Sequence, residues 1–193
     1  AVVFSDANTK EIPNRPPHNQ TQASELDNIN AASPHMHFIT NGEWSLAVSD
    51  VGTSISMSRG LDITRRSDDL LRRPQGVFAV AEVNGEVIPF TKAPIYDAEA
   101  EFTVKFADTY AAFKSKTDDA ECVSTVYVHP QLPAEQRNFS VKNLTDKSVR
   151  VNLLIYLEPC LSSYVDDAAH PAFSKLFLQS EYHDDSKILV FKR

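Results

Sequence analysis

The sequence has no long apolar segment and no excess of basic residues. None of its apolar runs approaches the roughly 18 to 20 residues that a membrane-spanning helix needs. Its 193 residues carry a net charge of −7, whereas a protein that binds nucleic acid usually presents a basic face. We therefore expect neither a membrane nor a nucleic acid as a partner. The acidic balance suits a neutral substrate such as a sugar.

Cysteine is scarce, and common catalytic and cofactor motifs are missing. The two cysteines, Cys122 and Cys160, lie in apolar, strand-like surroundings. This favours two buried free thiols in a reducing compartment, with a single disulfide as the alternative. There is no CxxC, zinc-ligand spacing, phosphate loop, dinucleotide fingerprint, GxSxG or Cys/His nucleophile pair. His35 and His37 could share one face of a strand and one metal, but no third ligand follows by spacing. We expect no metal, no cofactor and no catalytic residue in this chain.

A sustained helical apolar period is also absent, and short strand-like runs take its place. Asn-Gly pairs at 41–42 and 84–85 are typical of hairpin turns. Regularly spaced short strands predict an all-β, antiparallel β-sandwich. The nearly continuous apolar run at 149–157 predicts a strand covered on both faces, and therefore a large sandwich. Besides the strands flanking the two Asn-Gly pairs, the expected strands are residues 100–106, 110–114, 122–129, 136–143, 149–158, 175–181 and 188–191.

The N-terminal part has a different composition. Residues 8–34 are polar and contain four prolines, so we expect an extended arm over residues 1–34, with a short helical turn near 24–29. The sandwich domain is then residues 35–193. The sequence starts at Ala1, its first residues lack the basic start and long apolar core of a secretory signal, and strand-like runs lie close to both of its ends. We expect a piece of a longer cytoplasmic polypeptide. A processed mature protein is the alternative.

Two segments carry candidate functional residues. Five arginines and three aspartates alternate within residues 58–73, and either a binding site or an ion-paired surface loop would explain them. The segment 166–177, DDAAHPAFSKLF, combines acids, a histidine, a proline, aromatics and a lysine. Imidazole beside aromatic surface suits a sugar, and a well-packed loop is the alternative. The adjacent acids Asp166-Asp167 and Asp68-Asp69 point in opposite directions, so neither pair forms a glycosidase dyad by itself.

The string AHPAFSKLF at 169–177 resembles the glycoside phosphorylases of glycoside hydrolase family 94, in the branch of cyclic β-1,2-glucan synthases and 1,2-β-oligoglucan phosphorylases. Further similar segments occur in the family's order: ITNGEWS at 39–45, DITR at 62–65 and RNFSVKNLT at 137–145. The resemblance covers about residues 36–182. The chain departs from the family at residues 51–55, which lack its glycine run and aromatic, and at Arg66, which replaces a tryptophan. These departures favour the oligoglucan phosphorylases.

The resemblance implies a super-sandwich of the galactose-mutarotase type, placed before a helical (α/α)6 barrel that carries the catalytic aspartate and the phosphate site. The expected chemistry is an inverting phosphorolysis in which inorganic phosphate is the co-substrate. The sandwich alone would be inactive. It would bind a β-glucan oligosaccharide on the acceptor side, contact the catalytic domain of the parent chain and support a homodimer. The residues that match acceptor-side segments are Arg59, Arg65, Arg66, His170, Pro171, Phe173 and Lys175.

Two other functions are compatible with the sequence. The first is a free-standing carbohydrate-binding module, in which Trp44, Tyr96, Tyr164 and Phe173 form an aromatic platform on one sheet face. The second is a mutarotase-like enzyme on the same fold, with a histidine such as His170 and a carboxylate such as Glu158.

Overall fold

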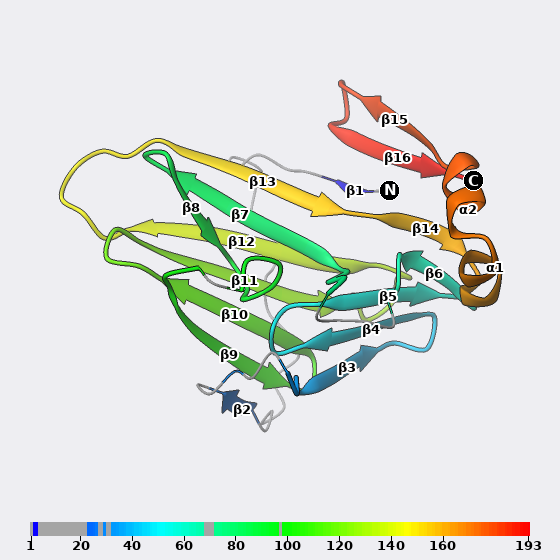
Figure 1. Cartoon of the computed structure of the whole chain (residues 1–193), viewed down its shortest axis with the longest axis horizontal. Coiled ribbons are helices and arrows are strands. Elements are labelled where there is room, and N and C mark those ends of the chain that lie inside the picture. Colours follow the sequence, from blue (N-terminus) through cyan, green and yellow to red (C-terminus); the bar gives the residue numbers. More distant parts are fainter. Residues whose placement is uncertain (1, 4–22, 27–28, 30–31, 68–71, 97) are drawn as a thin grey trace.

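The computed structural model describes residues 2–3, 23–26, 29, 32–67, 72–96 and 98–193. Figure 1 shows a largely β molecule with a pair of short helices at one end. The strands are β1 (Val2–Val3), β2 (Ala23–Leu26), β3 (Met36–Thr40), β4 (Trp44–Ser49), β5 (Ser54–Ser58), β6 (Leu61–Thr64), β7 (Val77–Val83), β8 (Glu86–Pro89), β9 (Glu101–Ala107), β10 (Tyr110–Lys116), β11 (Ala120–Val128), β12 (Glu135–Asn143), β13 (Val151–Leu157), β14 (Pro159–Ser162), β15 (Gln179–His183) and β16 (Ile188–Lys192). The helices are α1 (Tyr164–Ala169) and α2 (Pro171–Leu176). The expected all-β sandwich is confirmed.

The described strands form four antiparallel sheets. Two have five strands, in the orders β12-β11-β10-β9-β2 and β14-β6-β5-β4-β3. Two have three strands, in the orders β13-β7-β8 and β1-β16-β15. Part of the expected arm is thus a strand, because β2 pairs with β9 at the edge of the first sheet. At 24–26 the expected helical turn is wrong, since the cross-strand partner decides the conformation of this short segment. Positions 27–28 of that turn lie outside the described residues.

Strand β11 alternates strictly between buried and half-buried residues. Val126 and Val128 pack into one apolar cluster with β3, β4, β9 and β10, whereas Ala120 and Cys122 pack into a second cluster with β7 and β8. Alternate residues of a strand share one face. One face of the β11 sheet is therefore covered by two sheets side by side, which together make the second layer of the sandwich.

The two sheets of that second layer are joined in two places. Strand β13 ends at Leu157 and β14 begins at Pro159, so nearly continuous extended chain passes from one sheet into the other (Figure 1). Ser54 of β5 donates its N–H to the carbonyl of Gln75, just before β7, over 2.9 Å. Gly76 has a positive φ of 151°, and a Cβ there would lie 2.7 Å from the Ser54 nitrogen. Glycine is required at this junction because the two backbones approach so closely.

A buried polar network joins the layers. Glu135 of β12 accepts hydrogen bonds from Trp44 Nε1, over 3.1 Å, and from Ser56 Oγ, over 2.7 Å. Its second oxygen pairs with Arg137 Nε at 2.8 Å, and Arg137 also donates to Ser54 Oγ. Burial raises the pKa of Glu135, but Arg137 and the hydrogen bonds outweigh burial and bring that pKa below its ordinary value. The network therefore contains a buried, paired carboxylate.

Strand β13 differs from its expected environment. It lies at the edge of its sheet, and Val151, Leu153, Leu154 and Tyr156 are exposed. Only Ile155 packs against the second cluster. The expectation that this strand is covered on both faces is wrong for the described residues, although its apolar sequence is typical of a strand that is covered.

Most other sequence expectations agree with the strands observed. The 84–85 hairpin has positive φ at both Asn84 and Gly85, as a type I′ turn requires. Strands β5 and β6 were not expected, because their serines and charges look like a loop. The strand expected at 175–181 is wrong at its start, where Lys175 belongs to α2. Cys122 and Cys160 are buried free thiols, so the alternative of a disulfide is not realised. No helix in the described part is long and apolar enough to cross a membrane.

Candidate functional site

Helices α1 and α2 position the segment with the strongest family resemblance. Ser163 caps α1, since its Oγ accepts the N–H of Asp166 over 3.2 Å. Pro171 occupies the first turn of α2, where its missing N–H is harmless. Before α1, strand β14 shifts register between Pro159 and Ser162, and Leu161 there has a positive φ of 54°. Bulges and left-handed non-glycine residues are common near functional sites.

Arg65 fastens these helices to the sheet. It directly follows β6, its backbone N–H donates to the carbonyl of Glu158 over 2.8 Å, and its side chain is only 7% exposed. Its Nη1 donates to both oxygens of Asp167 on α1. Its Nε lies 3.1 Å from Glu158 Oε2, an ion pair whose angles do not make a hydrogen bond. The Nη2 atom has no hydrogen-bond partner among the described residues.

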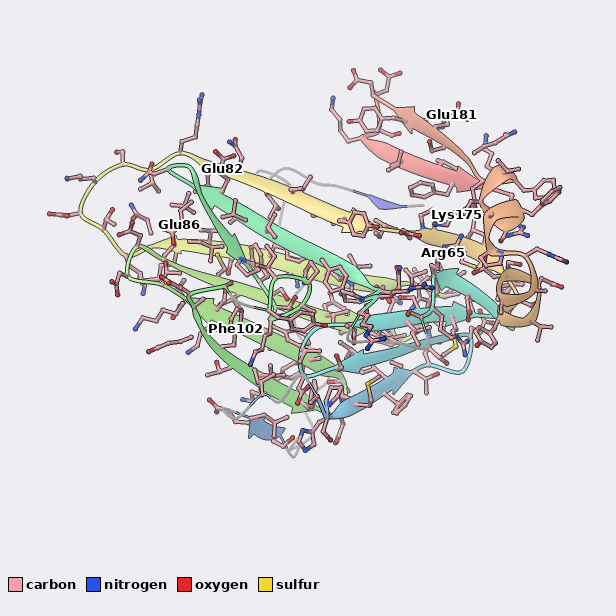
Figure 2. All side chains as sticks on the ribbon, viewed as in Figure 1. Arg65, Glu82, Glu86, Phe102, Lys175 and Glu181 are labelled. Carbon is pink, nitrogen blue, oxygen red and sulfur yellow. The ribbon has the colours of Figure 1, made fainter. Side chains whose placement is uncertain are left out.

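Glu158, between β13 and β14, is the second centre of contacts. Its Oε1 accepts the hydroxyl of Tyr156 over 2.9 Å, and its Oε2 lies 3.3 Å from Lys175 Nζ on α2. Lys175 is half-exposed, so the pair forms at the surface. Figure 2 shows Arg65 and Lys175 at the same end of the molecule, where the helices meet the sheet.

Both carboxylates of this cluster are anions at neutral pH. Burial raises the pKa of Asp167. Hydrogen bonds from Ser174 and Arg65, together with the charge of Arg65, outweigh burial and bring that pKa below its ordinary value. Burial also raises the pKa of Glu158, which Tyr156, Lys175 and Arg65 together bring below the ordinary value. A general acid needs a raised pKa. Neither group has one, so neither carboxylate is suited to act as a general acid at neutral pH.

The remaining arginine candidates are paired with acids. Arg66 binds both oxygens of Asp62, at 2.6 and 3.1 Å, and its guanidinium lies 4.6 Å from the centre of the Tyr164 ring. Arg59 is exposed in the β5–β6 turn, where it pairs with Glu43 of another turn at 3.3 Å. Arg65 and Arg66 therefore belong to the helix end of the sandwich and mainly position its parts. Arg59 is not joined to this cluster by any contact among the described residues.

The other predicted residues lie on the outside of the helices. His170, between α1 and α2, is exposed, as are Pro171 and Phe173 of α2. The Phe173 and Phe177 rings lie 6.1 Å apart and are tilted by 49°. Arg193 donates to Ser174 Oγ over 2.9 Å, which holds α2 from its buried side. The structure thus presents an imidazole and aromatic rings to solvent on a fixed support.

Several sequence candidates do not assemble into sites. His35 pairs with Asp50 at 3.0 Å, and His37 contacts the carbonyl of Ala107 at 2.8 Å. Among the described residues, no group of three metal-ligating side chains occurs. The expected platform on one sheet face is wrong, because Trp44 and Tyr96 pack against the core while Tyr164 and Phe173 lie on the helices. Asp68 and Asp69 lie outside the described residues.

Sequence reasoning missed several members of the cluster. Asp167 was considered only as half of an acidic pair and Glu158 only as a carboxylate of the mutarotase alternative. Tyr156 and Arg193 were not considered as site residues. Spacing could not join Arg65 to Asp167, which is 102 residues away. Because Tyr156 stands among apolar residues in the sequence, the pattern there indicates a core residue.

Comparison with known proteins agrees with the fold. A family model described as the supersandwich domain of glycosyl hydrolase 94 matches residues 22–193. The chain belongs to this family. It is also 26% identical over 157 residues to the cyclic beta-(1,2)-glucan synthase NdvB of Rhizobium meliloti (strain 1021). That match covers 80% of the chain and 6% of the relative. The family resemblance noted at 169–177 is confirmed, and the chain is a supersandwich domain of a carbohydrate-active enzyme family.

Proposed function

We propose that this chain is the non-catalytic sandwich domain of an inverting β-1,2-glucan phosphorylase and forms the acceptor side of its active-site cleft. The parent enzyme would use inorganic phosphate as co-substrate, and its catalytic aspartate would lie in another domain. The observation that carries the proposal is the helix pair α1–α2. This pair presents His170, Phe173 and Lys175 to solvent. Arg65, which follows β6, holds the pair against the sheet through Asp167.

The chemistry of this surface supports binding rather than catalysis. Aromatic rings stack on the apolar C–H faces of sugars, and imidazole and ammonium groups bond to hydroxyls. Two carboxylates beside this surface, Glu158 and Asp167, have lowered pKa values and are held by cations. They can accept hydrogen bonds but are poorly suited to protonate a leaving group at neutral pH. Under this proposal another domain supplies the acid.

The same surface gives the domain its partners under this proposal. Exposed apolar residues lie on and beside the helix pair, among them Val165, Leu176 and Phe177. The catalytic domain of the parent chain would cover part of this surface, and a second copy of the chain would complete a homodimer.

The proposal is tested by phosphorolysis. We expect the purified chain to release no glucose 1-phosphate from β-1,2-linked gluco-oligosaccharides and phosphate, because no acid is available. We expect the parent enzyme to release it. In the parent, Phe173→Ala is expected to raise KM for the oligosaccharide about tenfold with a smaller change in kcat. The control is Val87→Ala, at an exposed position on β8 outside the predicted site. Turnover by the isolated chain would contradict the proposal.

A further inference from the structure

Tyr156 has features of a ligand-binding residue, although the predicted site does not include it. It lies near the end of β13, its side chain is 49% exposed, and its hydroxyl is tied to Glu158 Oε1 over 2.9 Å. An exposed tyrosine on a surface strand usually rotates freely. Here the hydrogen bond fixes the ring, so an aromatic face is presented in one orientation without a further entropy cost on binding.

The groups beside the ring have hydrogen-bonding capacity left. Lys175 Nζ carries three N–H donors, and one of them is directed to Glu158 over 3.3 Å. The Lys175 side chain is 55% exposed. Glu158 is about one-quarter exposed and remains an anion, with four lone-pair positions on its two oxygens. An acceptor and a donor therefore lie next to the ring and within reach of solvent.

The charges of this cluster balance. Arg65 and Lys175 are cations, and Glu158 and Asp167 are anions that contact them. A ligand with a net charge gains little from such a cluster. A polyhydroxylated neutral ligand gains more, because its hydroxyls both donate and accept. A pyranose ring adds an apolar C–H face that matches the tyrosine ring.

We propose that Tyr156, Glu158 and Lys175 form a subsite for one glucosyl unit of a neutral β-linked oligosaccharide. Tyr156 stacks on the sugar ring, Glu158 accepts a hydroxyl proton in a hydrogen bond, and Lys175 donates to a neighbouring hydroxyl. The sugar class rests on the proposed function. The position of the subsite extends the acceptor surface from α2 onto β13.

The test compares variants of the chain by NMR titration with β-1,2-glucotriose, using saturation transfer to the sugar and shifts of backbone amides. We expect Tyr156→Ala to weaken binding about five- to tenfold. Tyr156→Phe keeps the ring but loses its tether to Glu158, so we expect a loss of about two- to threefold. The matched control is Tyr182→Ala, because Tyr182 of β15 is similarly exposed, at 54%, and lies outside the cluster.

Three outcomes would overturn the subsite. The first is no saturation transfer to the sugar in the unaltered chain, and the second is equal weakening of sugar binding in the Tyr156 and Tyr182 variants. The third is a Tyr156→Ala variant that changes sedimentation but leaves the sugar titration unchanged. The third would identify a protein contact. None of these outcomes bears on glucose 1-phosphate release by the parent enzyme, so failure of the subsite is separable from failure of the proposed function.

Discussion

The guanidinium of Arg65 is shared by two carboxylates that come from different parts of the chain. Asp167 belongs to α1, and Glu158 joins β13 to β14. Burying three charged groups is costly unless each is paired. The removal of the central cation would therefore leave two partly buried anions facing each other.

Arg65→Met is expected to lower the free energy of unfolding by about 3 kcal/mol, because uncompensated buried charge is strongly destabilising. Urea denaturation at pH 7 measures the difference. The control is Arg59→Met, which removes an ion pair whose arginine is 72% exposed, and should change stability by less than about 0.5 kcal/mol. Equal effects of the two substitutions would contradict the central role of Arg65.

Glu135 gives a pH-dependent prediction. Its pKa is lowered in the folded protein, so its contribution to stability is complete above the unfolded pKa of about 4.3 and is lost as the pH falls through the folded pKa. Glu135→Gln should therefore destabilise the protein at pH 7 and reduce the further loss of stability on acidification. Thermal unfolding from pH 7 to pH 3 measures both. Parallel pH profiles of the variant and the unaltered chain would contradict this, and Glu101→Gln, at an exposed position, is the control.

At the scale of elements, the alternation of apolar and polar residues and the turn residues predicted more of the observed strands than intrinsic propensity did. The Asn84-Gly85 turn and strands such as β11 follow from the sequence, because turn chemistry and the two-residue period are local. Helix α2 does not, because six residues carry no measurable helical period. Its position depends on Arg193 and on the cluster around Arg65, which are contacts between distant segments. The ligand-binding role of the predicted α2 residues stays a prediction, and the contacts that support this helix could not be read from the sequence.

A substitution at Gly76 tests how the two sheets of the second layer are joined. Gly76→Ala should cost more than about 2 kcal/mol, because it adds left-handed strain to a contact of 2.7 Å with the backbone of Ser54. Gly42→Ala is the matched control: φ there is also positive, but no atom lies within 4 Å. It should cost about 1 kcal/mol. Chemical denaturation compares them, and an equal cost would mean that the junction relaxes freely.

At the scale of the whole molecule, the uneven covering of the sandwich is the main feature. The β11 sheet has one face covered by two sheets, whereas β13 has exposed apolar residues and lies at an edge. Exposed apolar edge strands favour association with other strands. Strand β13 is therefore an alternative to the helix pair as the contact surface of the predicted homodimer.

Leu154→Lys is expected to reduce self-association of the chain, because Leu154 is 64% exposed on β13 and a lysine on an edge strand opposes pairing. The free energy of unfolding should change by less than about 0.5 kcal/mol. Sedimentation velocity over a range of concentrations measures association. The control is Val87→Lys, on the opposite edge strand β8. Unchanged association in the Leu154 variant, or an equal decrease in both, would exclude β13 as the contact.

Because β11 contributes residues to both apolar clusters, we expect the two clusters to unfold together. A substitution that weakens either cluster is then expected to lower the same cooperative transition. Evolution could diversify the surface at one end of this domain only within the stability margin set by the other.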